Sequence, residues 1–379
     1  MLLSISCFRG FPIFSICFRL FLIGVGLTAA INTQAQTRAY VARPIGFITV
    51  IDTDTNTVLT PIPVCSDDTC SPTIPAVTPD GARIYVTNNL QDTVTVINTL
   101  TNTVIDTITV GQSPWGIAIT PDGTRAYVAS RSGAISVIDT STNTVITSIA
   151  DSAGPLNVAI TPDGSRAYVS NLLGSISVVD ISTNTIITSF PILHFALPGF
   201  LQPAFNLFAI VLTPDGTRGY VASHSTGDTY VFSTISNSMT GTIPTGQGSP
   251  LSIAISPNGT RVYTANIDFD AFVQVIDTAT NTIIGKIPAA GPPPFVGVTP
   301  DSTRLYINAL GTTTVVDTSN NSIVTTILTG NSLAGIAFGT LPPVPHAKDD
   351  CKNGGFQRFT VLGFPNQGQC LKYVKEHAN

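Results

Sequence analysis

The side chains able to exchange protons near neutral pH are sparse in this chain. It has four histidines and a single glutamate, which are His194, His224, His346, His377 and Glu376. General acid–base catalysis would therefore have to rest on aspartate and on these few histidines. The sequence shows no cluster in which such groups converge, and it lacks both Cys-x-x-Cys-His and Gly-x-Ser-x-Gly. We predict no catalytic residue, no metal site and no cofactor, and we favour a protein that is not an enzyme.

Binding is the other use of polar and aromatic side chains, and the candidates for it lie in connections between expected strands. They are Trp115, Arg131, His194, His224, Asp228, Asp268 and Asp270. Each also fits the ordinary interpretation of a solvated loop residue. Asp268 and Asp270 have the chemistry to bind a cation, but two carboxylates do not complete a calcium cage. Convergence of His224, Asp228 and Asp268 around one cavity would instead indicate an enzyme.

A sequence repeat positions these candidates. Arg-x-Tyr occurs seven times, at spacings of 45, 42, 41, 52, 43 and 43 residues, beginning at Arg38, Arg83, Arg125, Arg166, Arg218, Arg261 and Arg304. A period of about 40–45 residues built from short β-branched runs is typical of a propeller blade. Because a residue needed in every blade organises that blade, we interpret the repeated Arg, Tyr, Asp and Asn as structural.

The clearest unit runs from Trp115 to Ile149. Its runs of β-branched residues predict four strands, which we denote A to D: Gly116–Thr120, Arg125–Ser130, Ala134–Asp139 and Thr144–Ile149. Thr-Pro-Asp-Gly separates A from B, and Asp-Thr-x-Thr-Asn-Thr separates C from D. Both contain the residues that tight turns require.

The two ends of the repeat complete one another. Arg38 has no A strand before it, and Leu333–Phe338 matches an A strand with no B strand after it. We therefore expect Leu333–Phe338 to join the blade formed by residues 38–63, so that the chain ends share one blade and close the ring. The predicted fold is all-β, a single seven-bladed β-propeller of four-stranded antiparallel blades over residues 36–339.

The segment Tyr85–Asn88 reads Tyr-Val-Thr-Asn, and with the two repeated turns it resembles the YVTN family of β-propeller repeats, a WD40-like class. The resemblance covers about residues 38–339 and implies the propeller fold. Relatives in this class include exported and cell-surface bacterial proteins, archaeal surface-layer proteins, and propellers similar to lactonases and to subunits of redox enzymes. A shared fold does not decide among these functions.

The N-terminus has the pattern of an export signal. Arg9 and Arg19 accompany an apolar stretch from Leu20 to Ile31, and Thr33-Gln34-Ala35 follows it. We expect a signal peptide over residues 1–35, cleaved near Ala35, with an uncleaved anchor as the alternative. The expected location is the periplasm, the cell surface or the medium, with no integral membrane domain after cleavage.

Four cysteines remain beyond that segment: Cys65, Cys70, Cys351 and Cys370. An even number fits two disulfides in an oxidising compartment. Three pairings are possible, and the layout favours the two local ones. A metal site is the alternative interpretation.

The chain ends in two segments that differ from the repeat. Residues 340–350 are rich in proline and predict a semi-rigid linker. Residues 351–379 contain Cys-Lys-Asn-Gly-Gly and Asn-Gln-Gly-Gln-Cys, and they resemble a short tail found at the ends of exported bacterial proteins. We expect a disulfide-stapled tail too small to fold without help, with a docking module as the alternative.

The connections between strands fall into two classes. The A–B and C–D turns repeat, whereas the B–C and D–A loops vary, and variable loops on a rigid frame are where binding usually occurs. The largest departure is the apolar insertion Phe190–Leu207, which could cover the ring mouth, contact a partner or pack on its own blade. The segment Cys65–Cys70, with Asp67 and Asp68, predicts a stapled surface loop.

Composition narrows the choice of partner. Only 10% of residues are charged, the formal net charge is −5, and no run of basic residues is present. Nucleic acid is therefore excluded as an expected partner. We predict an exported, monomeric binding scaffold that recognises a protein, an envelope component or a glycan through its variable face. The alternatives are a cell-surface structural or adhesive protein and a lactonase-like or hydrolase enzyme.

Overall fold

The computed structural model describes residues 36–65, 70–197, 200–245, 248–267, 271–292, 295–330 and 334–342, then 344, 348–352, 357, 359 and 364–377. All of these belong to the compact unit Ala35–Asn379. The predicted signal segment, residues 1–35, lies outside the described residues. Within the described residues, no helix is both long and apolar enough to cross a bilayer.

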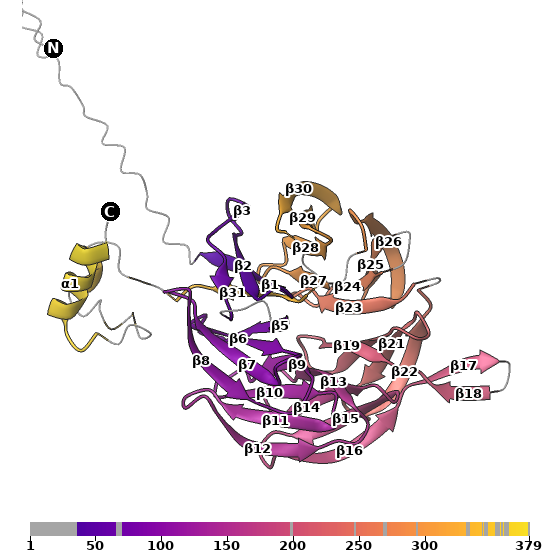
Figure 1. Ribbon diagram of the computed structural model, residues 1–379. Helices are drawn as coiled ribbons and strands as arrows, with labels where there is room; N and C mark the ends of the chain where they lie inside the picture. Colours follow the sequence, from indigo (N-terminus) through magenta and orange to yellow (C-terminus); the bar gives the residue numbers. More distant parts are fainter. Residues whose placement is uncertain are drawn as a thin grey trace, which may run out of the picture. The chain divides into compact units, whose positions relative to one another are not determined.

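The described strands build a ring of seven antiparallel blades, as the repeat predicts (Figure 1). Blade 2 consists of β5 (Pro72–Val77), β6 (Arg83–Asn88), β7 (Thr93–Asn98) and β8 (Thr103–Thr109). Blade 3 consists of β9 (Pro114–Ile119), β10 (Arg125–Ser130), β11 (Ala134–Asp139) and β12 (Thr144–Ala150). Blade 4 consists of β13 (Pro155–Ile160), β14 (Arg166–Asn171), β15 (Ser175–Asp180) and β16 (Thr185–Pro191). Blade 5 consists of β19 (Leu207–Leu212), β20 (Arg218–Ser223), β21 (Thr229–Ser233) and β22 (Ser238–Ile243). Blade 6 consists of β23 (Pro250–Ile255), β24 (Arg261–Asn266), β25 (Phe272–Asp277) and β26 (Thr282–Pro288). Blade 7 consists of β27 (Phe295–Val298), β28 (Arg304–Ala309), β29 (Thr312–Asp317) and β30 (Ser322–Leu328).

Blade 1 joins the two ends of the propeller, which confirms the predicted closure. It contains β1 (Thr37–Arg43), β2 (Phe47–Asp52), β3 (Thr57–Val58), β4 (Ile62–Pro63) and β31 (Ile336–Thr340). Strand β31 pairs antiparallel with β1, and Tyr40 lies opposite Ala337. The outer strand is split, because β3 and β4 both pair with β2. The closing strand begins three residues later than the predicted Leu333, and residues 331–333 lie outside the described residues.

The hydrophobic core lies between neighbouring blades rather than at one centre. One cluster combines Tyr127 and Val137 of blade 3 with Val158 and Val169 of blade 4. Successive side chains of strands B and C point to opposite faces of the blade, and each face is buried against a neighbouring blade. Burying these branched side chains contributes about 1.5–3 kcal/mol each, and this repeated interface is what the β-branched runs encode.

A repeated polar contact links a blade to the next one at five of the seven junctions that the structure describes. The Tyr127 hydroxyl donates a hydrogen bond to Asn184 Oδ1 at 2.6 Å, and the Arg125 guanidinium donates to the Ile181 carbonyl at 2.7 Å. Four further tyrosines make the same bond to the Asn of the following blade: Tyr85–Asn143, Tyr168–Asn237, Tyr220–Asn281 and Tyr306–Asn56. The last of these pairs crosses the ring closure.

The backbone conformation gives a second reason why Asn occurs at this position in every unit of the repeat. All seven occupy the left-handed region, with φ between 49° and 59°: Asn56, Asn102, Asn143, Asn184, Asn237, Asn281 and Asn321. Asn tolerates that conformation better than other residues with a Cβ. The repeated Arg side chains also have structural partners. Arg304 pairs with Asp317 of its own blade at 2.8 Å, while four other Arg side chains bind a carbonyl of the next blade.

Two segments lie outside the blades. The insertion after blade 4, predicted as a loop, forms the hairpin β17 (Leu193–Leu197) and β18 (Phe200–Pro203), whose base is buried through Ile192 and Ala204. The hairpin extends outward beside β22 rather than over the ring mouth (Figure 1). The tail contains a short helix η1 (Lys348–Cys351) and the helix α1 (Gln367–His377), which an all-β prediction did not include.

Candidate binding surface

The ring has two unlike faces. The turn face carries the A–B and C–D turns of the blades, and the loop face carries the B–C and D–A connections. On the turn face, the same aspartate contacts recur; for example, Asp163 accepts hydrogen bonds from Thr161 and Ser165, which hold its pKa below the usual range. The sequence candidates Trp115, Arg131 and His224 lie on the loop face, so that face is described in detail.

A row of four side chains lies at the centre of the loop face. The Arg131 guanidinium carbon lies 5.7 Å from the centre of the Trp115 ring, which is a cation–π contact. Trp115 meets Phe208 edge to face with centroids 6.0 Å apart, and Phe208 meets His224 in the same way at 5.5 Å. We call Arg131, Trp115, Phe208 and His224 the aromatic row. It joins blade 3 to blade 5.

Hydrogen bonds to its backbone hold the aromatic row in place. Thr87 Oγ1 donates to the Trp115 carbonyl at 2.8 Å, and Asn157 Nδ2 donates to the Phe208 carbonyl at 3.3 Å. The amide of His224 donates to the Asn206 carbonyl at 3.0 Å. Trp115, Phe208 and His224 are half-buried, and Arg131 is exposed. The row is therefore a fixed, partly open aromatic surface.

Below the row, the inner strands leave little room. A cavity of about 160 Å³ is lined by residues of blades 1, 2 and 4 to 7, among them Ile74, Ala209, Ile253, Val296 and Ile336. Its volume is smaller than that of typical small-molecule sites. A ligand of ordinary size would thus not fit between the inner strands at this point.

Large apolar side chains surround the row at the tips of the loops. The B–C loops of blades 1, 2, 4 and 7 and the connection into blade 5 each expose one by 44 to 72%: Ile45, Leu90, Leu173, Leu310 and Phe205. We call these five residues the apolar tips. Single exposed apolar residues are ordinary, but a set arranged around one face is typical of an interaction surface.

His194 and Asp228 lie together but away from the aromatic row. Both line a groove of about 530 Å³ between the hairpin and β22. Burial raises the pKa of Asp228, while a hydrogen bond from the Thr245 amide and attraction by His194 act in the opposite direction. His224 contacts Phe208 instead, and Asp268 and Asp270 lie outside the described residues.

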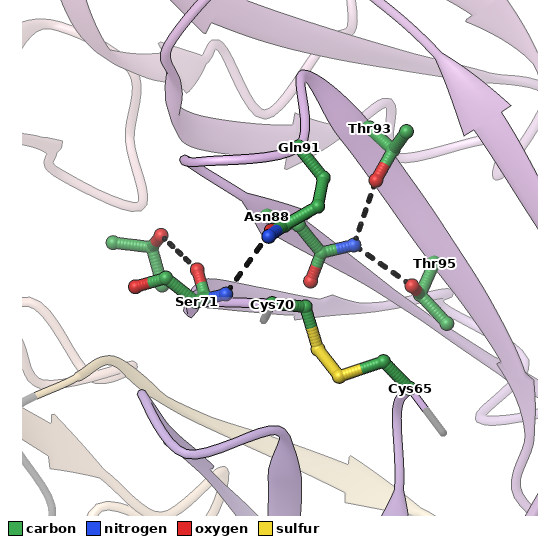
Figure 2. Close-up of a disulfide and its surroundings, with 8 residues drawn as sticks. Cys65, Cys70, Ser71, Asn88, Gln91, Thr93 and Thr95 are labelled. Carbon is green, nitrogen blue, oxygen red and sulfur yellow. Dashed lines mark hydrogen bonds between the residues drawn. A yellow bond between two sulfur atoms is a disulfide. The ribbon is translucent and has the colours of Figure 1, made fainter. Parts of the chain in front are cut away.

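The disulfide Cys65–Cys70 lies where blade 1 passes into blade 2, with a Cα–Cα distance of 6.3 Å (Figure 2). Nearby, the Ser71 amide donates to Gln91 Oε1 at 3.2 Å, and Asn88 Nδ2 donates to Thr93 and Thr95 (Figure 2). The predicted staple is confirmed, as is the second disulfide, Cys351–Cys370. Asp67 and Asp68 lie outside the described residues.

Sequence reasoning found Trp115, Arg131 and His224 but missed Phe208, which connects them. It also missed the apolar tips. A signal for the tips was present, because Leu90, Leu173 and Leu310 each stand between turn residues where the repeat predicts a solvated loop. Among the described residues, no group of three or more His, Cys, Asp or Glu side chains is placed to hold a metal ion.

No protein-family model matches the chain, and no curated protein matches it. Among solved structures it is similar to the hydrazine synthase of Kuenenia stuttgartiensis, with 24% identity and a TM-score of 0.62 over 76% of this chain and 90% of that one. It is also similar to a functionally unknown protein from Desulfotomaculum acetoxidans, with 19% identity and a TM-score of 0.65 over 80% of this chain and 99% of that one. At these identities the likeness shows the propeller fold and carries no activity to this chain.

Proposed function

We propose that this propeller is an exported, non-catalytic binding scaffold that holds a partner protein on its loop face. The observation that carries the proposal is the aromatic row at the centre of a face whose loop tips are apolar. Tryptophan and arginine are the residues that contribute most at protein interfaces, and such residues cluster near the centre of the contact. Apolar side chains around them exclude water from it.

The frame supports this interpretation. The row is fixed before any partner arrives, because hydrogen bonds from Thr87 and Asn157 hold the backbone of Trp115 and Phe208. A preformed surface loses less conformational entropy on binding than a mobile one. The residues that differ from blade to blade are thus supported by those that repeat.

Export is part of the proposal. Two disulfides favour an oxidising compartment, and the N-terminal pattern of residues 1–35 is typical of a signal peptide. The resemblance to YVTN repeats, whose relatives include exported proteins, agrees with this location. Periplasm, cell surface and medium all satisfy these observations.

The test is a crosslinking pull-down from the native cell with three forms of the chain. They are the wild type, the double variant Trp115→Ala/Phe208→Ala, and the control Ile235→Ser. Ile235 is 80% exposed in the C–D turn of blade 5, so the control removes an apolar side chain from the turn face.

We expect a discrete partner protein to be captured by the wild type and by Ile235→Ser, and to be lost with the double variant. Circular dichroism should show that all three forms are folded. Capture of the same partner by the double variant would overturn the proposal. A ladder of self-crosslinks in place of a partner would favour a structural surface protein, and retention on a glycan matrix alone would favour a glycan ligand.

A further inference from the structure

A second surface lies at the outer edge of blade 5, apart from the aromatic row. The groove that contains His194 and Asp228 is also lined by Leu193 of the hairpin and by Met239, Thr240, Gly241 and Thr242 of β22. Leu193 and His194 of the hairpin form the opposite wall. The hairpin itself projects outward from the region of β22 (Figure 1). The volume of about 530 Å³ lies within the range of sites that hold small molecules and short peptides.

The groove follows the edge of a strand. Residues 239–242 are consecutive, and consecutive side chains of a strand point to opposite faces of the sheet, so a groove that touches all four runs along the backbone edge. Strand β22 is the last of its sheet and pairs only with β21 among the described strands. An open edge presents unpaired N–H and C=O groups that can pair with another strand.

Gly241 leaves additional space at this edge. It stands where β12 of blade 3 has Thr147. A Cβ placed on Gly241 would meet nothing closer than Val231 Cβ at 4.0 Å, so the packing of the blade does not require glycine. Glycine within a strand weakens it, and it often marks a site where another backbone approaches closely.

The equivalent position of blade 6 gives a useful contrast. Gly285 of β26 is also a glycine, but Lys286 follows it, and its ammonium lies 4.4 Å from the centre of the Phe272 ring. Lysine on an outer strand is a common means of preventing edge pairing. In β22 the corresponding residue is the uncharged Thr242, so this edge lacks that protection.

The charge of the groove indicates which side chain would fit. Asp228 is half-buried in the lining of the groove, where it accepts a hydrogen bond from the Thr245 amide and is attracted by His194. A half-buried carboxylate is stabilised by a cation that brings its own hydrogen bonds. Leu193 and Met239 provide apolar contact beside it.

We infer that this groove binds an extended peptide segment of a partner protein, which adds a strand to the outer edge of β22 and places a lysine or arginine beside Asp228. Main-chain hydrogen bonds to β22 supply affinity in this mode of recognition, and pockets for alternate side chains supply specificity. The inference does not rest on the loop-face proposal, because it concerns other residues and another edge of the molecule.

The test uses phage-displayed random dodecapeptides selected on the full chain. We expect enriched peptides rich in β-branched residues with one lysine or arginine. A synthetic copy of an enriched peptide should lose about tenfold in affinity for Asp228→Asn, which removes a charge-assisted contact, and at least as much for Gly241→Thr, which narrows the edge. The matched control is Gly285→Thr, which changes the same position of blade 6 and should bind as the wild type does.

Two readouts distinguish a peptide that pairs with the edge of β22 from one that only adheres to the surface of the protein. Hydrogen exchange of the amides in residues 238–243 should slow on addition of the peptide, and a copy of the peptide with alternate amides N-methylated should not bind. The inference is wrong if selection enriches no such peptide, if Gly241→Thr binds as well as the wild type, or if the N-methylated copy binds equally well. Gly241→Thr should fold, because its Cβ has open space.

Discussion

The turn face and the loop face are built from the same strands, yet they differ in what they repeat. On the turn face, the same residues make the same contacts in blade after blade, such as Tyr127 with Asn184 and Tyr220 with Asn281. On the loop face, the aromatic row involves blades 3 and 5 and is not repeated among the described residues of the other blades. The residues that repeat from blade to blade thus build the frame, and the residues that differ between blades form the candidate binding surface.

The largest expected effect comes from opening the frame. A chain that ends before Leu333 lacks β31, which leaves β1 without its inner neighbour and should lower the Tm by about 10 °C or more. A chain that ends before Lys348 keeps β31 and should unfold at the wild-type temperature. Thermal unfolding followed by circular dichroism compares the two, and equal Tm values would contradict closure by β31.

The Cys65–Cys70 disulfide on the loop face closes a short loop and should stabilise the folded protein. Replacing both residues with alanine should lower the free energy of unfolding by about 2 kcal/mol, because the disulfide restricts the unfolded chain. Chemical denaturation measures the change. The matched control is the same replacement of Cys351 and Cys370, whose hydrophobic cluster contains tail residues only, so the propeller transition should not move.

The turn-face tyrosines allow a comparison within the repeat. Tyr127→Phe removes the hydroxyl that binds Asn184 and should destabilise the fold by about 1 kcal/mol. Tyr263 is equally buried, but its hydroxyl has no hydrogen-bond partner among the described residues, so Tyr263→Phe should be neutral or slightly stabilising. Urea denaturation of the two variants measures the difference. Equal losses would show that the tyrosine hydroxyl is not what links the blades.

The smallest expected effects have opposite signs on the two faces. Hydrogen bonds from Thr161 and Ser165 lower the pKa of Asp163, so its charge stabilises the fold at neutral pH, and this contribution is lost as the pH falls through the lowered pKa. Burial raises the pKa of Asp228, so its charge destabilises the fold above that raised pKa, and the penalty disappears as the pH falls below the usual range of aspartate.

Asparagine replacements test this contrast. At pH 7, Asp163→Asn should lower the Tm and Asp228→Asn should raise it, and both differences should close toward pH 3. Differential scanning calorimetry across this range measures them. Changes of the same sign in both variants would show that the surroundings of the two carboxylates do not differ as described. Asn258 already fills the Asp163 position in blade 6 and makes equivalent bonds, so the replacement is compatible with the turn.

The sequence predicts the frame well because the frame is repeated. Arg-x-Tyr and the two turns define seven units, and the unmatched strands at the two ends imply closure. The closing strand begins later than predicted because Gly335 makes hydrogen bonds outside the regular ladder. The Gly335 amide donates to the Thr73 carbonyl, and the Gly335 carbonyl accepts from the Ala42 amide.

The hairpin β17–β18 was missed for a different reason. It has no counterpart in the other blades, so the repeat could not predict it, although Pro198-Gly199 between two apolar runs is a turn signal. The tail helix α1 was missed because its few apolar residues give a weak helical pattern, and packing of Val374 with Phe359 and the two cysteines stabilises it.

The candidate surface could be predicted only in part. Trp115, Arg131 and His224 are found by asking which loop residues depart from the repeat. Phe208 lies within a strand and reaches Trp115 only because the ring brings blade 5 near blade 3, a distance that no local pattern encodes. The partnership of His194 with Asp228 likewise depends on where the hairpin lies.

The pairing of β1 with β31 also determines the order in which the blades can be completed during folding. The first blade cannot be completed until the last strand has been synthesised, and a contact such as Thr49 with Thr329 joins residues 280 positions apart. Contacts of this range form slowly, and an unpaired strand edge is prone to pair with other chains in the meantime. Strand β1 is therefore the part of the nascent chain that waits longest for its partner, and it is the place where a chaperone would protect the protein most.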